Sequence, residues 1–229
     1  MIYLIPSFLS ENAVETIPPY VMEAVKKCSV IFAENERTAR RFLKAMDKEI
    51  VIDSFEWHTI HKAEEQMILV FREKLKEGKN IAIISEAGCP GVADPGQVLI
   101  AEAQKMHEEI KPLVGPNSIL LALMASGLNG QQFSFAGYLP IDNAARIKKI
   151  KQLEAESLQK NCTQIFIETP YRNNKLLETI LAHGNTSTRL CIAAEITSTA
   201  EFIKTKTIED WKKEKLDLHK KPVIFLLQA

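Results

Sequence analysis

Residues 85–96 of the chain read Ser85-Glu86-Ala87-Gly88-Cys89-Pro90-Gly91-Val92-Ala93-Asp94-Pro95-Gly96. This stretch follows an apolar run, residues 81–84, and precedes a helical pattern that begins near Pro95. Open α/β sheets build their ligand sites from a buried strand that leads into a glycine-rich loop and then a helix. We therefore expect a ligand-binding loop here, with Asp94 as the N-cap of the next helix. An ordinary strand-to-helix turn is the alternative, because a glycine-rich loop alone is a weak signal.

The charge balance limits the possible partners. The chain has 229 residues, enough for one large or two small domains, and its formal net charge is zero, with 29 acidic and 29 basic residues. A molecule-wide positive field for nucleic acid is therefore excluded, and RNA binding would need local basic patches. Two helical stretches supply basic side chains, and solvated helix faces are the alternative for both: Arg37, Arg40, Arg41 and Lys44, and then Arg146, Lys148, Lys149 and Lys151.

Several classes of site are not expected. The four cysteines lie far apart and form no CxxC pair, which is typical of reduced thiols in the cytoplasm. His58 and His61 have no acidic or cysteine cluster beside them, so we expect no metal site. No apolar run reaches the roughly 18 residues that span a membrane, and the N-terminus resembles a first strand more than a signal peptide. No Walker loop, GxSxG elbow or GxGxxG motif is present.

Strands and helices alternate along the first half of the chain. Strands are expected at residues 2–5, 30–33, 49–53, 81–84 and 110–114, and helices at 18–27, 36–46, 62–76 and 95–107. Asn35 can cap the second helix and Gly78 can end the third. Because these strands are apolar throughout, we expect a parallel sheet that is covered on both faces.

The second half alternates less regularly. Helices are expected at residues 116–124, 142–159, 175–182 and 207–210, and strands at 133–138, 164–168, 190–194, 201–206 and 222–227. The last two strands follow each other closely, which favours a mixed sheet. The fold class is therefore α/β, with one domain at residues 1–114 and a second at 115–229.

Besides the loop at residues 85–94, polar residues follow four other expected strands. They lie in segments 6–10, 114–118, 168–172 and 195–197, where a ligand cleft between two α/β units is the default site. Asn117 and Ser118 also fit helix caps, Glu168 and Arg172 also fit a surface ion pair, and Glu195 also fits a solvated carboxylate.

Six motifs, in order, resemble the tetrapyrrole methylase family of S-adenosyl-L-methionine-dependent methyltransferases. Within it they resemble the branch that methylates the ribose 2′-hydroxyl of a cytidine in small-subunit ribosomal RNA. Residues 34–38 resemble E-D-T-R-T, and residues 85–96 resemble S-D-A-G-T-P-x-x-S-D-P-G. Residues 115–118 with 125–128 resemble P-G-P-S-A and A-S-G-L, and residues 135–140 resemble F-x-G-F-L-P. Residues 168–172 and 195–197 resemble E-S-P-H-R and E-L-T.

The resemblance implies two α/β domains with a cofactor cleft between them, and a homodimer. By position, the residues expected to line S-adenosyl-L-methionine are Pro6, Gly88, Cys89, Val92, Asn117 and Ser118. The residues expected to act as base, substrate positioner or anion holder are Glu34, Glu36, Arg37, Glu168, Arg172 and Glu195. Ion pairs are the alternative for each of these charged residues.

Several departures from the family's motifs, an atypical Asn117 among them, leave the acceptor open. The branch has T-P-I-G-N-L after its first strand, whereas this chain has Ile5-Pro6-Ser7-Phe8-Leu9-Ser10. Glu86 replaces an aspartate and Cys89 a threonine. The chain also stops soon after its last expected strand, without the further C-terminal segment of longer relatives. The expected function is therefore rRNA methylation in the cytoplasm. The alternatives are methylation of a tetrapyrrole or other small molecule, and a homologue that binds cofactor or RNA without turnover.

Overall fold

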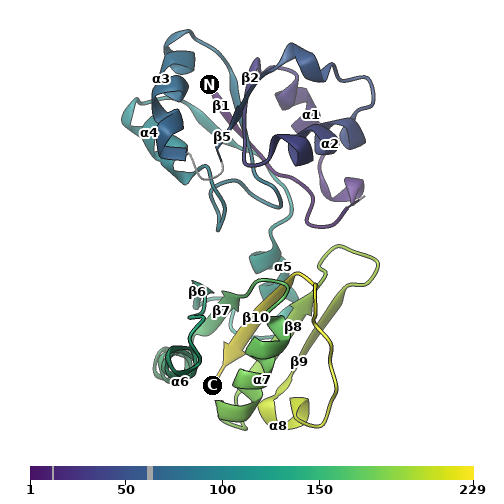
Figure 1. Ribbon diagram of the computed structural model, residues 1–229, viewed down its shortest axis with the longest axis vertical. Coiled ribbons are helices and arrows are strands. Elements are labelled where there is room, and N and C mark those ends of the chain that lie inside the picture. The colour runs from purple at the N-terminus through teal and green to yellow at the C-terminus, as the bar shows by residue number, and fades with distance from the viewer. Residues whose placement is uncertain (12, 61–63) are drawn as a thin grey trace. The chain divides into compact units, whose positions relative to one another are not determined.

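The computed structural model describes residues 1–11, 13–60 and 64–229. The chain divides into two compact units, Met1–Asn117 and Ser118–Ala229. Each unit is an α/β assembly around its own five-stranded sheet (Figure 1).

The N-terminal sheet is parallel throughout, as the apolar strands predict. Its order is β3-β2-β4-β1-β5. The strands are β1 (Ile2–Ile5), β2 (Val30–Ala33), β3 (Glu56–Thr59), β4 (Ile81–Ile84) and β5 (Ile110–Pro112). In the register, Ile2 of β1 lies beside Ile81 of β4 and Ile110 of β5. The central strands β2 and β4 are buried along their whole length, which explains their unbroken apolar sequence.

Helices cover both faces of this sheet. In Figure 1, α1 (Tyr20–Val25) and α2 (Glu36–Met46) lie on one side, and α3 (Ile68–Lys76) and α4 (Gln97–Lys105) on the other. Each side has its own apolar core: Phe42 and Leu43 of α2 pack in the first, and Phe71 of α3 and Leu99 of α4 in the second. Short 3₁₀ turns stand at Val14–Thr16, Ile52–Ser54 and Glu64–Met67.

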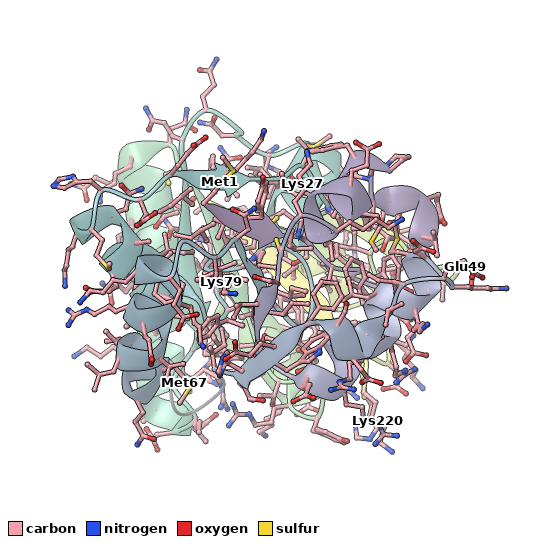
Figure 2. The ribbon with its side chains drawn as sticks, turned by 90° about the horizontal axis from the view of Figure 1, so that it is seen from above. Met1, Lys27, Glu49, Met67, Lys79 and Lys220 are labelled. Atoms are coloured by element: carbon pink, nitrogen blue, oxygen red, sulfur yellow. The ribbon has the colours of Figure 1, made fainter. Side chains whose placement is uncertain are left out.

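Two elements differ from the sequence-based expectation. The strand expected at residues 49–53 is wrong: Glu49 projects outward (Figure 2), Val51 is 65% exposed, and the strand runs over Glu56–Thr59 instead. The helix expected from Pro95 begins at Gln97, and Gly96, with φ +113°, is its N-cap in place of Asp94. The first residues of the helix expected at 62–76, Lys62 and Ala63, lie outside the described residues.

The C-terminal sheet is mixed, as expected. Its order is β6-β7-β10-β8-β9; β6 pairs with β7 in parallel, and the other neighbours are antiparallel. The strands are β6 (Phe133–Tyr138), β7 (Thr163–Ile167), β8 (Arg189–Ala194), β9 (Phe202–Thr207) and β10 (Val223–Gln228).

Four helices accompany this sheet: α5 (Ser118–Ser126), α6 (Asn143–Lys160), α7 (Asn173–His183) and α8 (Ile208–Trp211). The last three share one apolar core with the sheet, centred on Phe166, Phe225 and Trp211. Thr207 is the N-cap of helix α8, because its hydroxyl accepts from the Asp210 amide at 3.1 Å. Helix α5 packs against β8, β9 and β10.

Candidate functional site

Three loops meet at the carboxyl edge of the N-terminal sheet. They follow β1, β4 and β5, which are neighbouring parallel strands. The first two are joined by a two-way bridge: the Ser7 amide donates to the Gly88 carbonyl at 2.9 Å, and the Gly88 amide donates to the Ser7 carbonyl at 3.2 Å. The Ser7 hydroxyl also donates to the Ser85 carbonyl at 2.8 Å. The loops therefore form one hydrogen-bonded structure.

The loop after β5 packs tightly on the loop after β1. A Cβ placed on Gly115 would lie 2.2 Å from the Cβ of Pro6, so only glycine fits there. The Cys89 thiol donates to the Pro116 carbonyl at 3.5 Å, and a side-chain hydrogen bond links Cys89 to Asn117. Burial raises the pKa of the Cys89 thiol, which favours its neutral form.

The turn after β4 has an unusual backbone. Gly88, Gly91, Ala93 and Gly96 all have positive φ, from 62° to 113°. Gly91 and Gly96 are also crowded, because an added Cβ would lie 3.0 Å from Ile100 and 3.1 Å from Ile83. The glycines of the quoted stretch are thus required by the shape of the turn itself.

The surface of these loops offers both polar and apolar groups. The backbone amides of Ala87, Cys89 and Gly115 donate to no group in the described part of the chain. Beside them, the apolar side chains of Val92 and Val114 are 47% and 69% exposed. Such a surface can contact both polar and apolar parts of a ligand.

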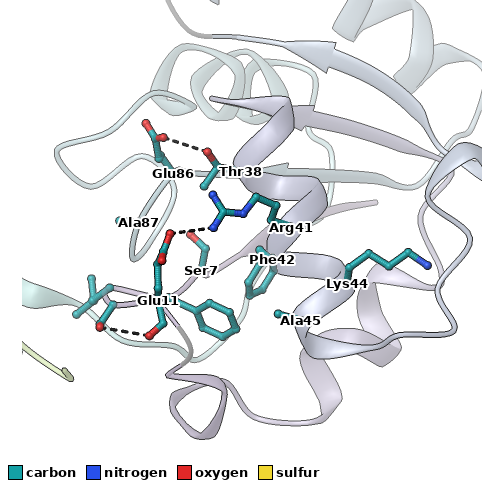
Figure 3. Close-up of a pocket in the computed structure, with 12 residues that line it drawn as sticks. Ser7, Glu11, Thr38, Arg41, Phe42, Lys44, Ala45, Glu86 and Ala87 are labelled. Atoms are coloured by element: carbon teal, nitrogen blue, oxygen red, sulfur yellow. Dashed lines mark hydrogen bonds and ion pairs between the residues drawn. The ribbon is translucent and has the colours of Figure 1, made fainter. Parts of the chain in front are cut away.

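Carboxylates gather behind the turn. Glu34 follows β2, and its carboxylate accepts from the Glu86 amide at 2.8 Å. The Glu86 carboxylate in turn accepts from Asn35 at 3.3 Å. It also accepts from Thr38 at 3.1 Å (Figure 3). Burial, with further contributions from Glu34 and Glu86, raises the pKa of Asp94 to about 7. Of the candidates on this unit, Glu34 is therefore held directly against the glycine-rich turn.

Glu36 and Arg37 are the first two residues of helix α2. Glu36 pairs with Arg40 one turn away at 2.7 Å. Arg40 also contacts Asp53 at 3.5 Å and lies over the ring of Trp57 at 5.0 Å. The Arg37 side chain is exposed and has no ion-pair partner among the residues that the structure describes.

A cavity of about 460 Å³ opens beside the same loops (Figure 3). It lies within the N-terminal unit, between the loop after β1, helix α2 and the start of the turn after β4. Its lining residues are Ser7, Phe8, Leu9, Ser10, Glu11, Thr38, Arg41, Phe42, Lys44, Ala45, Glu86 and Ala87. The sequence did not predict this cavity. The one signal was the segment Pro6 to Ser10, which differs from the family's motif and contributes Phe8 and Leu9 to the lining.

In the C-terminal unit, the buried Glu168 pairs with the half-buried Arg172. The Glu168 side chain is 1% exposed, and one of its carboxylate oxygens accepts from Arg172 Nε at 3.0 Å and Nη2 at 2.5 Å. The same oxygen accepts from the Thr169 amide at 2.7 Å. The pair therefore fixes the turn between β7 and α7.

Glu195 ends strand β8 in a strained turn. Glu195 and Thr197 have φ of +52° and +68°, backbone values that residues other than glycine rarely adopt. The Glu195 carboxylate lies 3.7 Å from Lys221 Nζ, and the Glu195 amide donates to the Pro222 carbonyl at 3.0 Å. Strain of this kind concentrates at functional turns.

The second basic patch is smaller than the sequence suggests. Arg146 is buried, and its guanidinium donates to Thr179 at 3.2 Å, to the Ile141 carbonyl at 2.9 Å and to Asn143 at 2.7 Å. It therefore joins helices α6 and α7 and is not part of a solvated basic face. Lys148 remains exposed.

His58 is held by contacts within the N-terminal unit. His58 stacks on Phe32 at 4.8 Å and contacts Glu56 at 2.9 Å, while His61 lies outside the described residues. Within the described ranges, no group of three His, Cys, Asp or Glu residues is placed to hold a metal ion. Among these residues there is also no helix with the length and apolar character needed to cross a membrane.

Known proteins resemble this chain in sequence and in fold. Residues 13–212 match the family of Tetrapyrrole (Corrin/Porphyrin) Methylases. Ribosomal RNA small subunit methyltransferase I of Vibrio cholerae serotype O1 is 30% identical over 203 residues, which cover 89% of this chain and 67% of that protein. The crystal structure of diphthine synthase aligns with a TM-score of 0.70 at 14% identity, covering 100% of this chain and 89% of that one. Uroporphyrin-III C-methyl transferase from Thermus thermophilus, complexed with S-adenyl homocysteine, aligns with a TM-score of 0.58 at 13% identity, covering 100% and 97%.

The two α/β units have the fold of these two solved proteins. The chain belongs to the tetrapyrrole methylase family, and it is a methyltransferase that uses S-adenosyl-L-methionine. The resemblance of the six motifs is thereby confirmed at the level of the family.

Proposed function

We propose that this protein methylates a ribose 2′-hydroxyl of small-subunit ribosomal RNA. The observation that carries the proposal is the 30% identity to a protein named for methylation of that RNA, extending over 89% of this chain. The convergence of three loops at one edge of the N-terminal sheet supports it, because that edge offers free amides and an apolar wall.

We infer that the cofactor contacts the glycine-rich turn through Gly88, Cys89 and Val92. Pro6 sets the position of Gly115 in the loop after β5, and the neighbouring Asn117 and Ser118 offer polar side chains at the start of α5. Bound S-adenosyl-L-methionine supplies an activated methyl group. The residues of the chain hold the acceptor oxygen in line with that methyl, and placement of this kind provides a large part of the rate enhancement.

The acceptor hydroxyl must also lose its proton. Glu34 is our candidate for the base or for a residue that positions it, because it is bound to the turn itself. Glu36 and Glu195 are secondary candidates, and we assign the Glu168–Arg172 pair to positioning because each partner is already engaged by the other. The exposed Arg37 suits an RNA phosphate.

Homodimer formation and a cytoplasmic location complete the proposal. Both rest on the family resemblance. Size-exclusion chromatography with light scattering at several protein concentrations tests the first, and cell fractionation tests the second.

Methylation of a tetrapyrrole or another small molecule is the second candidate. The cavity beside the loops favours it, because about 460 Å³ lies within the range of small-molecule sites, ~300–1,000 Å³. A homologue that binds cofactor or RNA without turnover is a third reading, and the same experiment separates the three.

The deciding experiment is transfer of a labelled methyl group to small ribosomal subunits from cells that lack this protein. Digestion of the RNA to nucleosides followed by mass spectrometry identifies the methylated atom. We expect one 2′-O-methylated nucleoside per subunit. Label on a base would correct the acceptor atom. Cofactor binding without label in RNA would contradict the proposal, and label in an added tetrapyrrole would favour the second candidate.

A further inference from the structure

The cavity beside the loop after β1 has an aromatic wall. Phe8 and Phe42 meet edge to face, with ring centroids 4.9 Å apart and an interplanar angle of 75°. Phe42 is only 4% exposed and anchors the pair in the core, whereas Phe8 is partly buried and lines the cavity with Leu9. A planar group that enters the cavity can therefore stack against Phe8 at little cost in side-chain ordering.

The mouth of the cavity carries one ion pair that a ligand can open. Arg41 on helix α2 bonds to Glu11 at 2.9 Å across the mouth (Figure 3). Both side chains are largely exposed, at 64% and 80%, so the pair contributes little to stability. An incoming phosphate can take the place of the Glu11 carboxylate on Arg41, since guanidinium groups bind both in the same geometry.

The charges that line the cavity select among ligands. Glu11 and Glu86 line the cavity together with Arg41 and Lys44. The Lys44 ammonium donates to the Lys48 carbonyl at 3.0 Å and points away from the two carboxylates (Figure 3). A tetrapyrrole that bears several carboxylates would meet no excess of positive charge here. A single nucleotide of RNA offers a flat base and one phosphate on each side, which matches one aromatic wall and one exchangeable arginine.

The cavity also adjoins the turn that we assign to the cofactor. Ser7, Glu86 and Ala87 line the cavity, and Ser7 is bonded to Gly88 in both directions. An occupant of the cavity therefore lies beside the glycine-rich turn, where the acceptor oxygen has to be.

We propose that this cavity holds the base of an unstacked RNA nucleotide against Phe8, with Arg41 released from Glu11 to bind the adjoining phosphate. The inference rests on the proposed function, because RNA must be the acceptor. It adds Phe8 and Arg41 as the residues that position the nucleotide. Enzymes that modify nucleotides commonly take the target out of the stack in this way.

The test compares variants in steady-state methylation of small ribosomal subunits. Stacking on an aromatic side chain is worth ~1–3 kcal/mol, so Phe8→Ala should raise the KM for subunits by about 5- to 150-fold. Its affinity for S-adenosyl-L-methionine, measured by calorimetry, should change less than about twofold. Phe8→Tyr keeps the ring and should restore most of the activity. Phe133→Ala, at a residue 43% exposed on strand β6, is the matched control and should leave the KM unchanged.

A second variant avoids any question of folding. Glu11→Gln leaves the aromatic wall intact and frees Arg41, so it should lower the KM for subunits about two- to fivefold at low salt. An unchanged KM in Phe8→Ala, with the wild-type protein active on RNA, would overturn this inference and leave the proposed function standing. An inactive wild-type protein would instead contradict the proposed function. Competition by a free tetrapyrrole but not by RNA would assign the cavity to that ligand class.

Discussion

At the scale of single residues, the site depends on close backbone approach. Gly115 shows this most clearly, because its missing side chain is the space that Pro6 occupies. Two loops from neighbouring strands thereby come into contact without any charged group. In the turn after β4, the positive φ values at Gly88, Gly91 and Gly96 give the backbone a shape that residues with side chains rarely adopt.

Gly115→Ala should therefore disturb the site. The added Cβ would lie 2.2 Å from Pro6, and overpacking of this kind lowers the free energy of unfolding by about 1–3 kcal/mol. The affinity for S-adenosyl-L-methionine should fall as well, since the loops can no longer meet. Urea unfolding and calorimetry measure the two effects. Gly130→Ala is the control, because nothing lies within 4 Å of its Cβ, and equal effects of the two substitutions would contradict the argument.

Asp94 gives a prediction for pH. Its folded pKa of about 7 lies above the unfolded value near 3.8, so the folded chain binds more protons between those values. Its contribution to stability is complete below about pH 4 and is lost as the pH rises through 7. Asp94→Asn should therefore raise the free energy of unfolding at pH 8 by roughly 1 kcal/mol, since solvent screens this half-buried group, and should have little effect at pH 4. Urea unfolding across this range tests it. Asp53→Asn, at a side chain 91% exposed, should show no such difference, and parallel curves for both variants would refute the prediction.

At the scale of elements, local signals predicted the regular parts of the fold. Helix α2 begins and ends where the sequence indicates, because Asn35 caps it and its side chain accepts from the Thr38 amide at 3.3 Å. Strands β2 and β4 followed from unbroken apolar runs. Strand β3 did not, because it is an edge strand with polar residues, and the apolar run before it mixes the buried Ile50 with the exposed Val51.

The site was predictable in part for the same reason. Parallel strands end at one edge, so the loops after β1, β4 and β5 could be brought together from the sequence. The cavity could not, because its wall joins Phe8 to Phe42 and Glu86, which are far apart along the chain. Arg146 shows the opposite error: helical spacing makes it part of a basic face, and only packing reveals that it is buried.

Arg146→Leu should accordingly act on stability. It removes three hydrogen bonds, one to Thr179 of α7 and two to residues at the start of α6, and leaves their acceptors partly unpaired. The free energy of unfolding of the C-terminal unit should therefore fall by about 2–4 kcal/mol. Lys148→Leu on the exposed face of the same helix should stay within about 0.5 kcal/mol. Thermal and urea unfolding measure both. A stable Arg146→Leu protein with weakened RNA binding would show that the residue serves as part of a nucleic-acid surface after all.

At the scale of the whole molecule, neutrality sets how RNA can be bound. With 29 acidic and 29 basic residues, long-range attraction is absent, and affinity must come from stacking and from a few uncompensated cations. Two of the four cations of helix α2 are already paired: Arg40 with Glu36, and Arg41 with Glu11. We therefore expect RNA binding with a weak dependence on salt, equivalent to about one to three phosphate contacts.

Arg37 and Arg40 allow a matched test on one helix. Arg37 is exposed without an ion-pair partner in the described part of the chain, so Arg37→Gln should reduce the slope of log K against log salt by about 0.7, the value for one phosphate on a single strand. Arg40→Gln removes a side chain held by Glu36, Asp53 and Trp57 and should leave the slope unchanged. Fluorescence anisotropy of a labelled RNA fragment between about 50 and 200 mM salt measures it. If Arg37 neutralises a phosphate, its loss leaves that phosphate with its counterions and must lower the slope. A steep slope that neither substitution alters would therefore place the RNA on another surface.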